Sequence, residues 1–311
     1  MTLPDPGQVP ELPFAGRSIL VTGGAHRVGG AISRYLGARG ARILVHYHSS
    51  AARAADLVAG LPGGGAAFGA DLSDPEGPRR LFDACRAAGE MPGAVVHAAA
   101  SFLHLPLLET AAADWDAVQA LNLRAFFLLA QELVRARGEQ GGDLVAIGDT
   151  AAIELWSGYV AHSVAKAALI PLVKALAKAL APRYRVNGVM PGPVLAPPGT
   201  PPAELEAMRQ RTLLKRLGDP VDVARAVEFL LRSDFSTGSW VEVTGGSQLW
   251  RGQAPAASAA KKAEAPPEAA AQGSEIPAAE ASESTGAVQS RQSPADRRGV
   301  GGARTEGEPE S

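Results

Sequence analysis

The chain turns through Thr22-Gly23-Gly24-Ala25-His26-Arg27-Val28-Gly29-Gly30, between an apolar run at 18–22 and a helical pattern at 28–39. Glycines in such a turn let the backbone bend sharply and let a pyrophosphate approach the start of the helix. The free N–H groups and the dipole of a helix N-terminus both favour an anion. The turn therefore predicts a dinucleotide-binding site that includes Gly23, Arg27, Val28 and Gly29.

Short apolar runs alternate with helical patterns on either side of this turn. The expected strands are 18–22, 42–47, 66–70, 94–98, 143–147, 185–189 and 240–243. The expected helices are 28–39, 51–59, 75–88, 111–137, 158–181 and 220–232. The strand runs are apolar throughout, as in parallel strands that helices cover on both faces. The predicted fold class is α/β, a Rossmann-type doubly wound parallel sheet, whose ligands bind beyond the carboxyl ends of the strands.

The composition of the chain changes abruptly after residue 250. Residues 251–311 contain no Leu, Phe, Tyr, Trp or Met and are rich in Ala, Pro, Gly, Ser and Glu. A segment of this kind cannot bury enough apolar area to offset its chain entropy. We expect a lead-in at 1–13, a single domain at 14–250 and a disordered tail at 251–311, which is either a solvated appendage or a partner-binding segment.

Charge and cysteine content narrow the class of protein. The formal net charge of −2 gives no electrostatic reason to expect nucleic acid or an acidic membrane as partner. Cys85 is the lone cysteine, which excludes an internal disulfide and a cysteine-built metal site. No apolar run is expected to reach the length of a membrane span, and residues 1–12 lack the pattern of a signal peptide. These features predict a cytoplasmic protein without a bound metal.

The end of the second expected strand favours NADP(H) over NAD(H). An NAD site usually places a carboxylate there to bind the ribose 2′-hydroxyl. Here the sequence has no carboxylate between the strand end at Tyr47 and Asp56. Hydroxyl and imidazole groups suit a 2′-phosphate, and Arg27 adds a positive charge. The residues expected at the 2′-phosphate are His48, Ser49 and Ser50. Asp71 and Leu72, which close the third strand, are expected at the adenine edge.

Together these residues resemble the classical short-chain dehydrogenase/reductase family, and within it the pteridine reductases. The resemblance spans 14–250. Arg27 stands where most members have glycine, and segments 46–52, 214–220 and 237–246 match the 2′-phosphate loop and the C-terminal signature. The resemblance implies an NADP(H)-dependent reductase of a small molecule. It also implies that helices 111–137 and 158–181, which are apolar on more than one face, form the interface of a homodimer or homotetramer.

The same resemblance implies which residues form the active site. Asn122 matches the catalytic asparagine of the family and Lys166 the catalytic lysine, which is also expected to bind the cofactor. In a module without turnover, Lys166 would remain only as a donor to the ribose hydroxyls. Asp149 falls where most members have serine and pteridine reductases have aspartate. The backbone positions expected to contact the cofactor are Ala98, Ala99, Pro191 and Gly192. The family's Asn-Asn-Ala-Gly is altered to His97-Ala98-Ala99-Ala100.

Two aromatic residues are candidates for the substrate site. Phe102 lies where pteridine reductases stack the substrate ring against the nicotinamide, and a flat substrate between two flat groups is physically reasonable. Tyr159 is one helical turn before the catalytic motif and is expected on the same helix face. The alternative for both residues is a role in packing alone.

The Tyr-x-x-x-Lys motif of the family reads His162-Ser163-Val164-Ala165-Lys166. The Lys166 ammonium disfavours an imidazolium at His162, whereas the Asp149 carboxylate favours it. Two hypotheses follow. In the first, the protein is an NADPH-dependent reductase of a C=O or C=N bond in a pterin-like substrate, and His162, assisted by Asp149, supplies or relays the proton. In the second, it is a catalytically weak or inactive NADP(H)-binding regulatory module.

Overall fold

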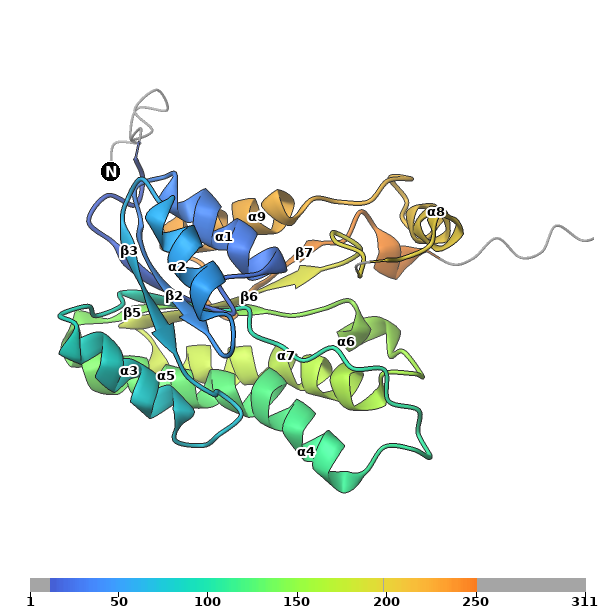
Figure 1. Cartoon of the computed structure of the whole chain (residues 1–311), viewed down its shortest axis with the longest axis horizontal. Helices are drawn as coiled ribbons and strands as arrows, with labels where there is room; N and C mark the ends of the chain where they lie inside the picture. Colours follow the sequence, from blue (N-terminus) through green and yellow to red (C-terminus); the bar gives the residue numbers. More distant parts are fainter. Residues whose placement is uncertain (1–11, 198, 251–311) are drawn as a thin grey trace, which may run out of the picture. The chain divides into compact units, whose positions relative to one another are not determined.

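The computed structural model describes residues 12–197 and 199–250. Within these residues seven parallel strands form one sheet in the order β3-β2-β1-β4-β5-β6-β7 (Figure 1). The strands are β1 (Ser18–Thr22), β2 (Arg42–Tyr47), β3 (Gly65–Gly69), β4 (Ala94–His97), β5 (Gly142–Ile147), β6 (Tyr184–Pro191) and β7 (Trp240–Val243). The strand order reverses beside β1, so the sheet is doubly wound, as the alternation of strands and helices predicts.

Helices cover both faces of the sheet (Figure 1). One face carries α1 (Arg27–Gly37), α2 (Ala51–Ala59) and α9 (Pro220–Arg232), and the other carries α3 (Gly77–Ala87), α5 (Ala125–Arg137) and α7 (Val160–Leu180). Shorter helices are α4 (Ala112–Gln119), α6 (Ala151–Glu154) and α8 (Pro202–Gln210), with 3₁₀ turns at Gly138–Gln140 and Ser247–Leu249. Pro220 at the first turn of α9 and the Asp219 cap, which accepts from Val221 N–H at 2.8 Å, explain the sharp start of that helix.

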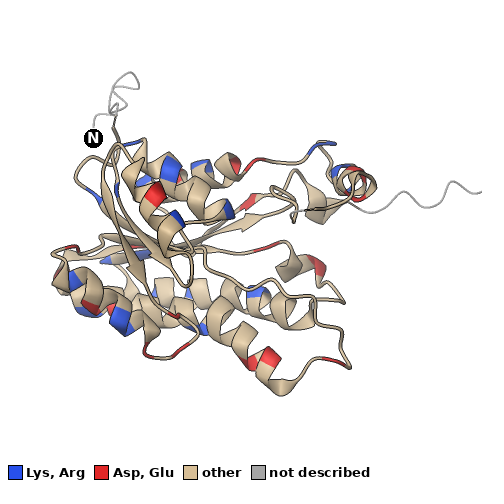
Figure 2. Cartoon of the chain, viewed as in Figure 1, with Lys and Arg blue, Asp and Glu red and all other residues tan. Residues whose placement is uncertain are grey.

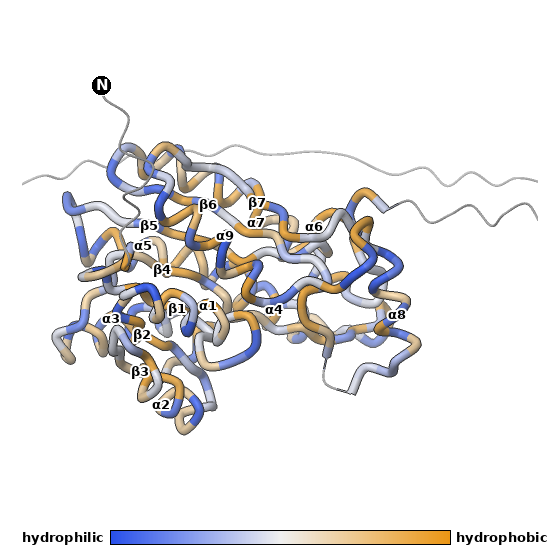
Figure 3. The backbone as a smooth tube through the Cα atoms, turned by 90° about the horizontal axis from the view of Figure 1, so that it is seen from above, coloured by the Kyte–Doolittle hydropathy of each residue, from blue (hydrophilic) through white to orange (hydrophobic). Residues whose placement is uncertain are grey.

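The core consists of two apolar layers, one on each face of the sheet. Ile19 and Val21 of β1 point into the layer under α1 and α9, whereas Leu20 points into the layer under α3, α5 and α7. Because both faces are buried, the successive residues 19–21 are all apolar, which explains the unbroken apolar runs. The hydrophobic strands lie inside the molecule (Figure 3). The charged residues lie mainly on helices and loops (Figure 2).

The structure departs from the expected elements in one important place. The helix expected at 111–137 is interrupted by a π turn at Ala120–Arg124, which separates α4 from α5. In this turn the Ala125 N–H bonds to the Ala120 carbonyl, five residues earlier. Tyr159, expected inside a helix at 158–181, is instead the N-cap residue of α7. The expected disordered tail at 251–311 lies outside the described residues.

The expectation that no apolar run reaches the length of a membrane span was wrong. Ala112–Gln140 and Val160–Leu180 are both long and apolar enough by length and composition. Phe126, Leu129 and Val173 of these segments are fully buried against the sheet. A helix of the core must be apolar for this reason, so the two segments are weak indicators of a membrane protein.

Candidate active site

The glycine turn between β1 and α1 forms a cradle that side chains would fill. Gly23 has φ +61°, and a Cβ atom there would lie 2.9 Å from the Ala99 Cα. A Cβ atom at Gly29 would lie 2.3 Å from the Gly23 carbonyl oxygen. Both contacts are with backbone, which cannot move aside, so only glycine fits. The bare backbone in front of α1 therefore fits the pyrophosphate of a dinucleotide. Val28, also expected here, packs its side chain against the core.

Arg27 adopts φ +46°, a conformation that favours glycine and costs an L side chain about 1–2 kcal/mol. Its guanidinium donates hydrogen bonds to the carbonyls of Leu195 and Ala196, at 3.0 and 3.4 Å. These carbonyls belong to the loop that follows Pro191 and Gly192. A Cβ atom at Gly192 would lie 2.8 Å from Thr244 Cα, so this turn also depends on glycine. Arg27 thus connects the glycine turn to the loop over the nicotinamide end of the expected cofactor site.

Two buried histidines, neither of them predicted as a site residue, hold the glycine turn. His46 accepts a hydrogen bond from Gly23 N–H at Nδ1 (3.1 Å) and donates one from Nε2 to the Ala70 carbonyl (3.0 Å). Burial lowers the pKa of His46 to about 4, so its ring is neutral. His46 therefore faces inward from β2, and its role is to fix the turn rather than to meet a phosphate.

His97 occupies the first position of the altered Asn-Asn-Ala-Gly segment. Its Nδ1 accepts from the Thr22 hydroxyl (2.9 Å), and its Nε2 donates to the Leu121 carbonyl in the π turn (3.2 Å). Burial, together with the Lys166 charge, lowers the pKa of His97 to about 3. The Thr22 hydroxyl oxygen in turn accepts from the N–H groups of Ala98 and Ala99, at 3.2 and 3.1 Å. The histidine thus replaces asparagine as the tie between the strand ends and the helix.

The residues expected at the 2′-phosphate lie together at the start of α2. His48 and Ser49 are exposed, and the Ser50 hydroxyl contacts His26 Nε2 at 2.5 Å. Arg53, in the first turn of α2, donates to the other ring nitrogen of His26. Sequence reasoning missed Arg53 because its contact with the glycine turn joins residues far apart in the chain. The one available signal was an arginine one turn after a hydroxyl-rich strand end.

The adenine-edge candidates follow β3. The Asp71 carboxylate accepts from the N–H and the hydroxyl of Ser73, at 2.8 and 2.6 Å, and these bonds hold the pKa of Asp71 below its usual range. Asp71 is exposed, whereas the Leu72 side chain is buried in the core. Leu72 can therefore offer a ligand only its backbone.

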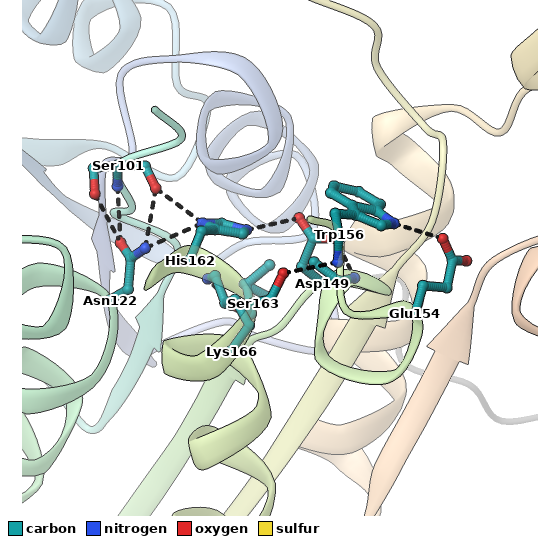
Figure 4. A network of polar contacts seen from close by, with 10 residues as sticks. Ser101, Asn122, Asp149, Glu154, Trp156, His162, Ser163 and Lys166 are labelled. Carbon is teal, nitrogen blue, oxygen red and sulfur yellow. Dashed lines mark hydrogen bonds and ion pairs between the residues drawn. The ribbon is translucent and has the colours of Figure 1, made fainter. Parts of the chain in front are cut away.

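The four residues expected to be catalytic converge at the end of β5 and the start of α7 (Figure 4). His162 Nε2 lies 3.3 Å from Asp149 Oδ2, and His162 Nδ1 lies 3.2 Å from Asn122 Nδ2 and 3.1 Å from the Ser101 carbonyl. Asn122 also accepts from Ser101 N–H at 2.8 Å and donates to its carbonyl at 3.0 Å. Ser101 is therefore a backbone clamp for the site that sequence reasoning missed.

His162 differs from Asp149 in its exposure. His162 is 3% exposed, and both of its ring nitrogens have partners inside the protein. The Asp149 side chain is 25% exposed and uses its other oxygen to accept from Ala151 N–H at 2.9 Å. Asp149 is thus the member of the pair that solvent or a bound molecule reaches.

Lys166 lies one turn further along α7 from His162 and is buried. Its ammonium donates to the Ile147 carbonyl at 2.8 Å. Burial lowers the pKa of Lys166 to about 8, although the Asp149 carboxylate acts in the opposite direction. The lysine and the aspartate are therefore electrostatically coupled, as a site for charge stabilisation requires.

Aromatic rings adjoin this cluster on the solvent side. Phe102 is 45% exposed, stacks on Tyr159 with ring centroids 4.5 Å apart, and meets the His162 ring edge-on at 5.0 Å. Trp156 meets both Phe102 and Tyr159 edge-on at 6.1 Å. Tyr159 and His162 thus both contact the Phe102 ring, which brings the two aromatic candidates together beside the catalytic cluster. Phe102 is thus a partly exposed ring beside the catalytic cluster.

Metal ligands do not gather anywhere in the described part of the chain. Over residues 12–197 and 199–250 no three His, Cys, Asp or Glu side chains form a group that could hold a metal ion.

Comparison with known proteins places these features in a family. The family model described as "Enoyl-(Acyl carrier protein) reductase" matches residues 23–248. The chain is 30% identical to an NADPH-dependent aldehyde reductase-like protein of Arabidopsis thaliana, over 76% of this chain and 96% of that protein. A short-chain dehydrogenase from Burkholderia cenocepacia in complex with NADP is 32% identical, with a TM-score of 0.70, over 76% of this chain and 99% of that one.

A third similar protein is named as a dihydrofolate reductase. FolM alternative dihydrofolate reductase 1 from Brucella canis, solved with NADP, is 27% identical with a TM-score of 0.70, over 78% of this chain and 98% of that one. The match to the family model covers nearly the whole sheet and both ends of the site. The chain therefore belongs to the classical short-chain dehydrogenase/reductase family of NAD(P)-dependent oxidoreductases.

Proposed function

We propose that the protein is an NADPH-dependent reductase of a C=O or C=N bond in a small, flat, pterin-like substrate. The contact of His162 Nε2 with Asp149 Oδ2, at 3.3 Å, carries the proposal. It supports a role for the pair in holding a proton beside Asn122 and Lys166, at the position that the resemblance assigns to the family's tyrosine. When bound, NADPH supplies the hydride, so the protein must supply the proton.

The choice of NADPH is supported by the groups around the ribose end of the glycine turn. Arg53 and the Ser50 hydroxyl meet at His26, and Arg27 lies in the turn itself. A 2′-phosphate is stabilised by such donors and a 2′-hydroxyl does not need them. Two of the structural neighbours hold NADP, which agrees with this choice.

The proton passes through Asp149. Because His162 is enclosed, its imidazolium form, with Nδ1 donating to the Ser101 carbonyl, can release the Nε2 proton only toward Asp149 Oδ2 and so becomes a neutral imidazole. The Asp149 carboxyl group, which is partly exposed, then protonates the substrate. The Lys166 ammonium stabilises the carboxylate that remains. His162 thus acts as a proton reserve behind the acid, and Asn122 and Ser101 hold its ring in place.

The substrate binds against the aromatic cluster. A flat ring can pack against the exposed part of Phe102, whose ring stacks on Tyr159. Stacked aromatic pairs contribute about 0.5–1.5 kcal/mol beyond their buried area. The resemblance to pteridine reductases and the neighbour named as a dihydrofolate reductase support a pterin-like ring.

A second candidate function is an NADP(H)-binding module with little or no turnover. The observation that favours it is the enclosure of His162, which is 3% exposed and engaged at both nitrogens. In this case Lys166 would hold the cofactor and Asn122 would hold the helix. The protein would then be a regulatory module that depends on bound NADP(H).

The two functions are separated by steady-state NADPH oxidation with a panel of pterins, quinones and small carbonyls. A reductase turns over in the wild type, faster toward acidic pH, and loses about a hundredfold or more in His162→Ala and Asp149→Asn. Lys174→Met, an exposed change on the same helix, is the matched control and keeps full activity. Activity that appears only in His162→Tyr favours the binding module. Absence of NADPH binding contradicts both functions.

We also propose that the protein forms a homodimer or homotetramer in the cytoplasm. A groove of about 650 Å³ runs over α4, the π turn and α7, and its apolar lining includes Leu123, Phe127 and Leu172. Phe127 is 40% exposed there, which suits a subunit contact. Light scattering of the purified chain tests the assembly, and a monomer at micromolar concentration contradicts it. The cytoplasmic location is tested by cell fractionation.

A further inference from the structure

His26 connects the glycine turn with the start of α2 through both of its ring nitrogens. Arg53 donates to Nδ1, and Nε2 lies 2.5 Å from the Ser50 hydroxyl. A guanidinium can only donate, so Nδ1 carries no proton and the ring proton is on Nε2. The ring is therefore neutral in this arrangement. Burial and the Arg53 charge both lower the pKa of His26 below its ordinary value.

The surroundings of His26 are strongly basic. A groove of about 350 Å³ is lined by Ala25, His26, Arg27, Arg34, Arg53, Asp56 and Leu57. Arg27 and Arg34 come from α1, and Arg53 and Asp56 come from α2. Three arginines and one aspartate thus line the groove, and the blue basic positions on the helices can be followed in Figure 2. A groove of this charge, beside a serine hydroxyl, fits a dianionic phosphate.

We propose, on the basis of the NADPH-dependent function above, that His26 takes up a proton when a cofactor with a 2′-phosphate binds. The preference for NADPH over NADH consequently increases as the pH falls from 8 to 6. His26 is then a specificity-determining residue whose charge is created by the ligand that it recognises.

The reason is an exchange of neighbours. A 2′-phosphate accepts from the Arg53 guanidinium more strongly than a neutral imidazole does, because that bond is charge-assisted at both ends. The lone pair at His26 Nδ1 is then released from its cationic partner. At the same time an anion arrives beside the ring. Both changes favour the imidazolium form. Asp56, Arg27 and Arg34 are present in the free and the bound state alike, so their effects largely cancel.

The ionisation of the phosphate acts with the opposite sign. A phosphate monoester loses its second proton near pH 6, so a site that selects the dianion releases protons on binding. A chain without a titratable group at position 26 therefore shows zero or negative proton uptake. The direction of proton transfer distinguishes His26 from the ligand itself.

The test is isothermal titration calorimetry of the full chain at pH 7, in buffers of different ionisation enthalpy, with NADPH and NADH. The wild type is expected to take up about half a proton or more per NADPH bound, and none with NADH. His26→Gln keeps a donor for Ser50 but cannot titrate, and it is expected to take up none. Between pH 8 and pH 6 the ratio of the NADH and NADPH dissociation constants should rise about fivefold or more in the wild type and stay flat or fall in His26→Gln.

Arg53→Gln provides a second variant. Because the cation is then missing in both states, the uptake at His26 should be smaller than in the wild type, and NADPH should bind about tenfold more weakly. NADPH binding without proton uptake, or equal uptake in wild type and His26→Gln, overturns this role of His26 and leaves the proposed reductase in place. Failure of NADPH to bind overturns both.

Discussion

The hydroxyl of Thr22 lies 2.9 Å from Nδ1 of His97 and joins the end of β1 to the end of β4. Through its other nitrogen His97 reaches the Leu121 carbonyl, next to Asn122. One neutral imidazole therefore links the expected cofactor-binding edge of the sheet to the turn that carries a catalytic residue. His46 of β2 is also neutral, and it holds the glycine turn by accepting a hydrogen bond from Gly23 N–H.

These two histidines should make the protein sensitive to acid. Their folded pKa values, about 4 for His46 and about 3 for His97, lie below the ordinary value of 6.5. Below pH 6.5 the unfolded chain binds protons that the folded chain does not, so stability falls as the pH decreases. At pH 5 each histidine should have removed about 2 kcal/mol from the free energy of unfolding. Urea unfolding at pH 8, 6.5 and 5 measures this loss.

The matched variant for that experiment is His97→Asn, which restores the residue that the family has at this position. Its stability should depend less steeply on pH between 6.5 and 5 than that of the wild type. An identical slope in the two proteins would show that His97 is not the group responsible.

Gly29→Ala should disrupt the cofactor cradle. The added Cβ would lie 2.3 Å from the Gly23 carbonyl oxygen, which is backbone. We expect a loss of about 2–3 kcal/mol in the free energy of unfolding and at least tenfold weaker NADPH binding. Gly60→Ala is the control, because the nearest atom to its Cβ is 3.6 Å away. Thermal unfolding and fluorescence titration measure both effects, and equal behaviour of the two variants would contradict the close approach.

Arg185→Met should destabilise the fold far more than a surface arginine does. Arg185 pairs with Asp143 at 2.7 Å and donates to the Leu230 and Leu231 carbonyls at the end of α9, at 2.8 and 3.1 Å. Removing one partner of a largely buried pair costs about 3–5 kcal/mol. Arg225→Met, which removes an exposed pair with Asp222, should cost less than about 1 kcal/mol.

The burial of Asp143 adds a pH dependence to this prediction. Burial raises the pKa of Asp143 even with the arginines present. Without Arg185 the carboxylate keeps Arg17 as a cationic partner, at 2.6 Å, but its pKa should rise further, so the Arg185→Met defect should be smaller at pH 5 than at pH 8. A defect that is independent of pH would indicate that the carbonyl contacts alone matter.

Lys166 should leave a signature at alkaline pH. Its folded pKa of about 8 is below its ordinary value of 10.5 because the side chain is buried. Between these pH values the unfolded chain retains a proton that the folded chain has lost, so this residue makes stability rise with pH. The difference in unfolding free energy between wild type and Lys166→Met should shift by about 3 kcal/mol in favour of the wild type from pH 7.5 to 10.5. Lys174→Met, which is exposed, should show no such shift.

The fold could be predicted because its signals are local. The glycine turn, the apolar strands and the capped start of α9 each depend on a few adjacent residues. Strand boundaries shifted where the register is set by neighbours: β6 extends from Tyr184 to Pro191 because β5 and β7 both pair along it. The π turn has no recognisable local pattern, because the Leu121 carbonyl within it accepts a hydrogen bond from His97, which lies on a distant strand.

The site was predicted only in part for the same reason. Family resemblance singled out Asn122, Asp149, His162 and Lys166, and they do converge. The enclosure of His162 by the Ser101 backbone and the link between His26 and Arg53 arise from tertiary contacts. No spacing along the chain encodes them.

The π turn at Ala120–Arg124 is equivalent to one additional residue within an otherwise regular helix. Deleting a single residue from it would allow α4 and α5 to fuse into one continuous helix. The two flanking helices would keep their places, because the turn itself accommodates the extra residue. The Leu121 carbonyl, to which His97 donates, would return to the regular helical pattern, and Asn122 would lose the local geometry that places its amide 3.2 Å from His162 Nδ1. Every catalytic side chain would still be encoded, so the site depends on the length of the chain at this turn as well as on its residues.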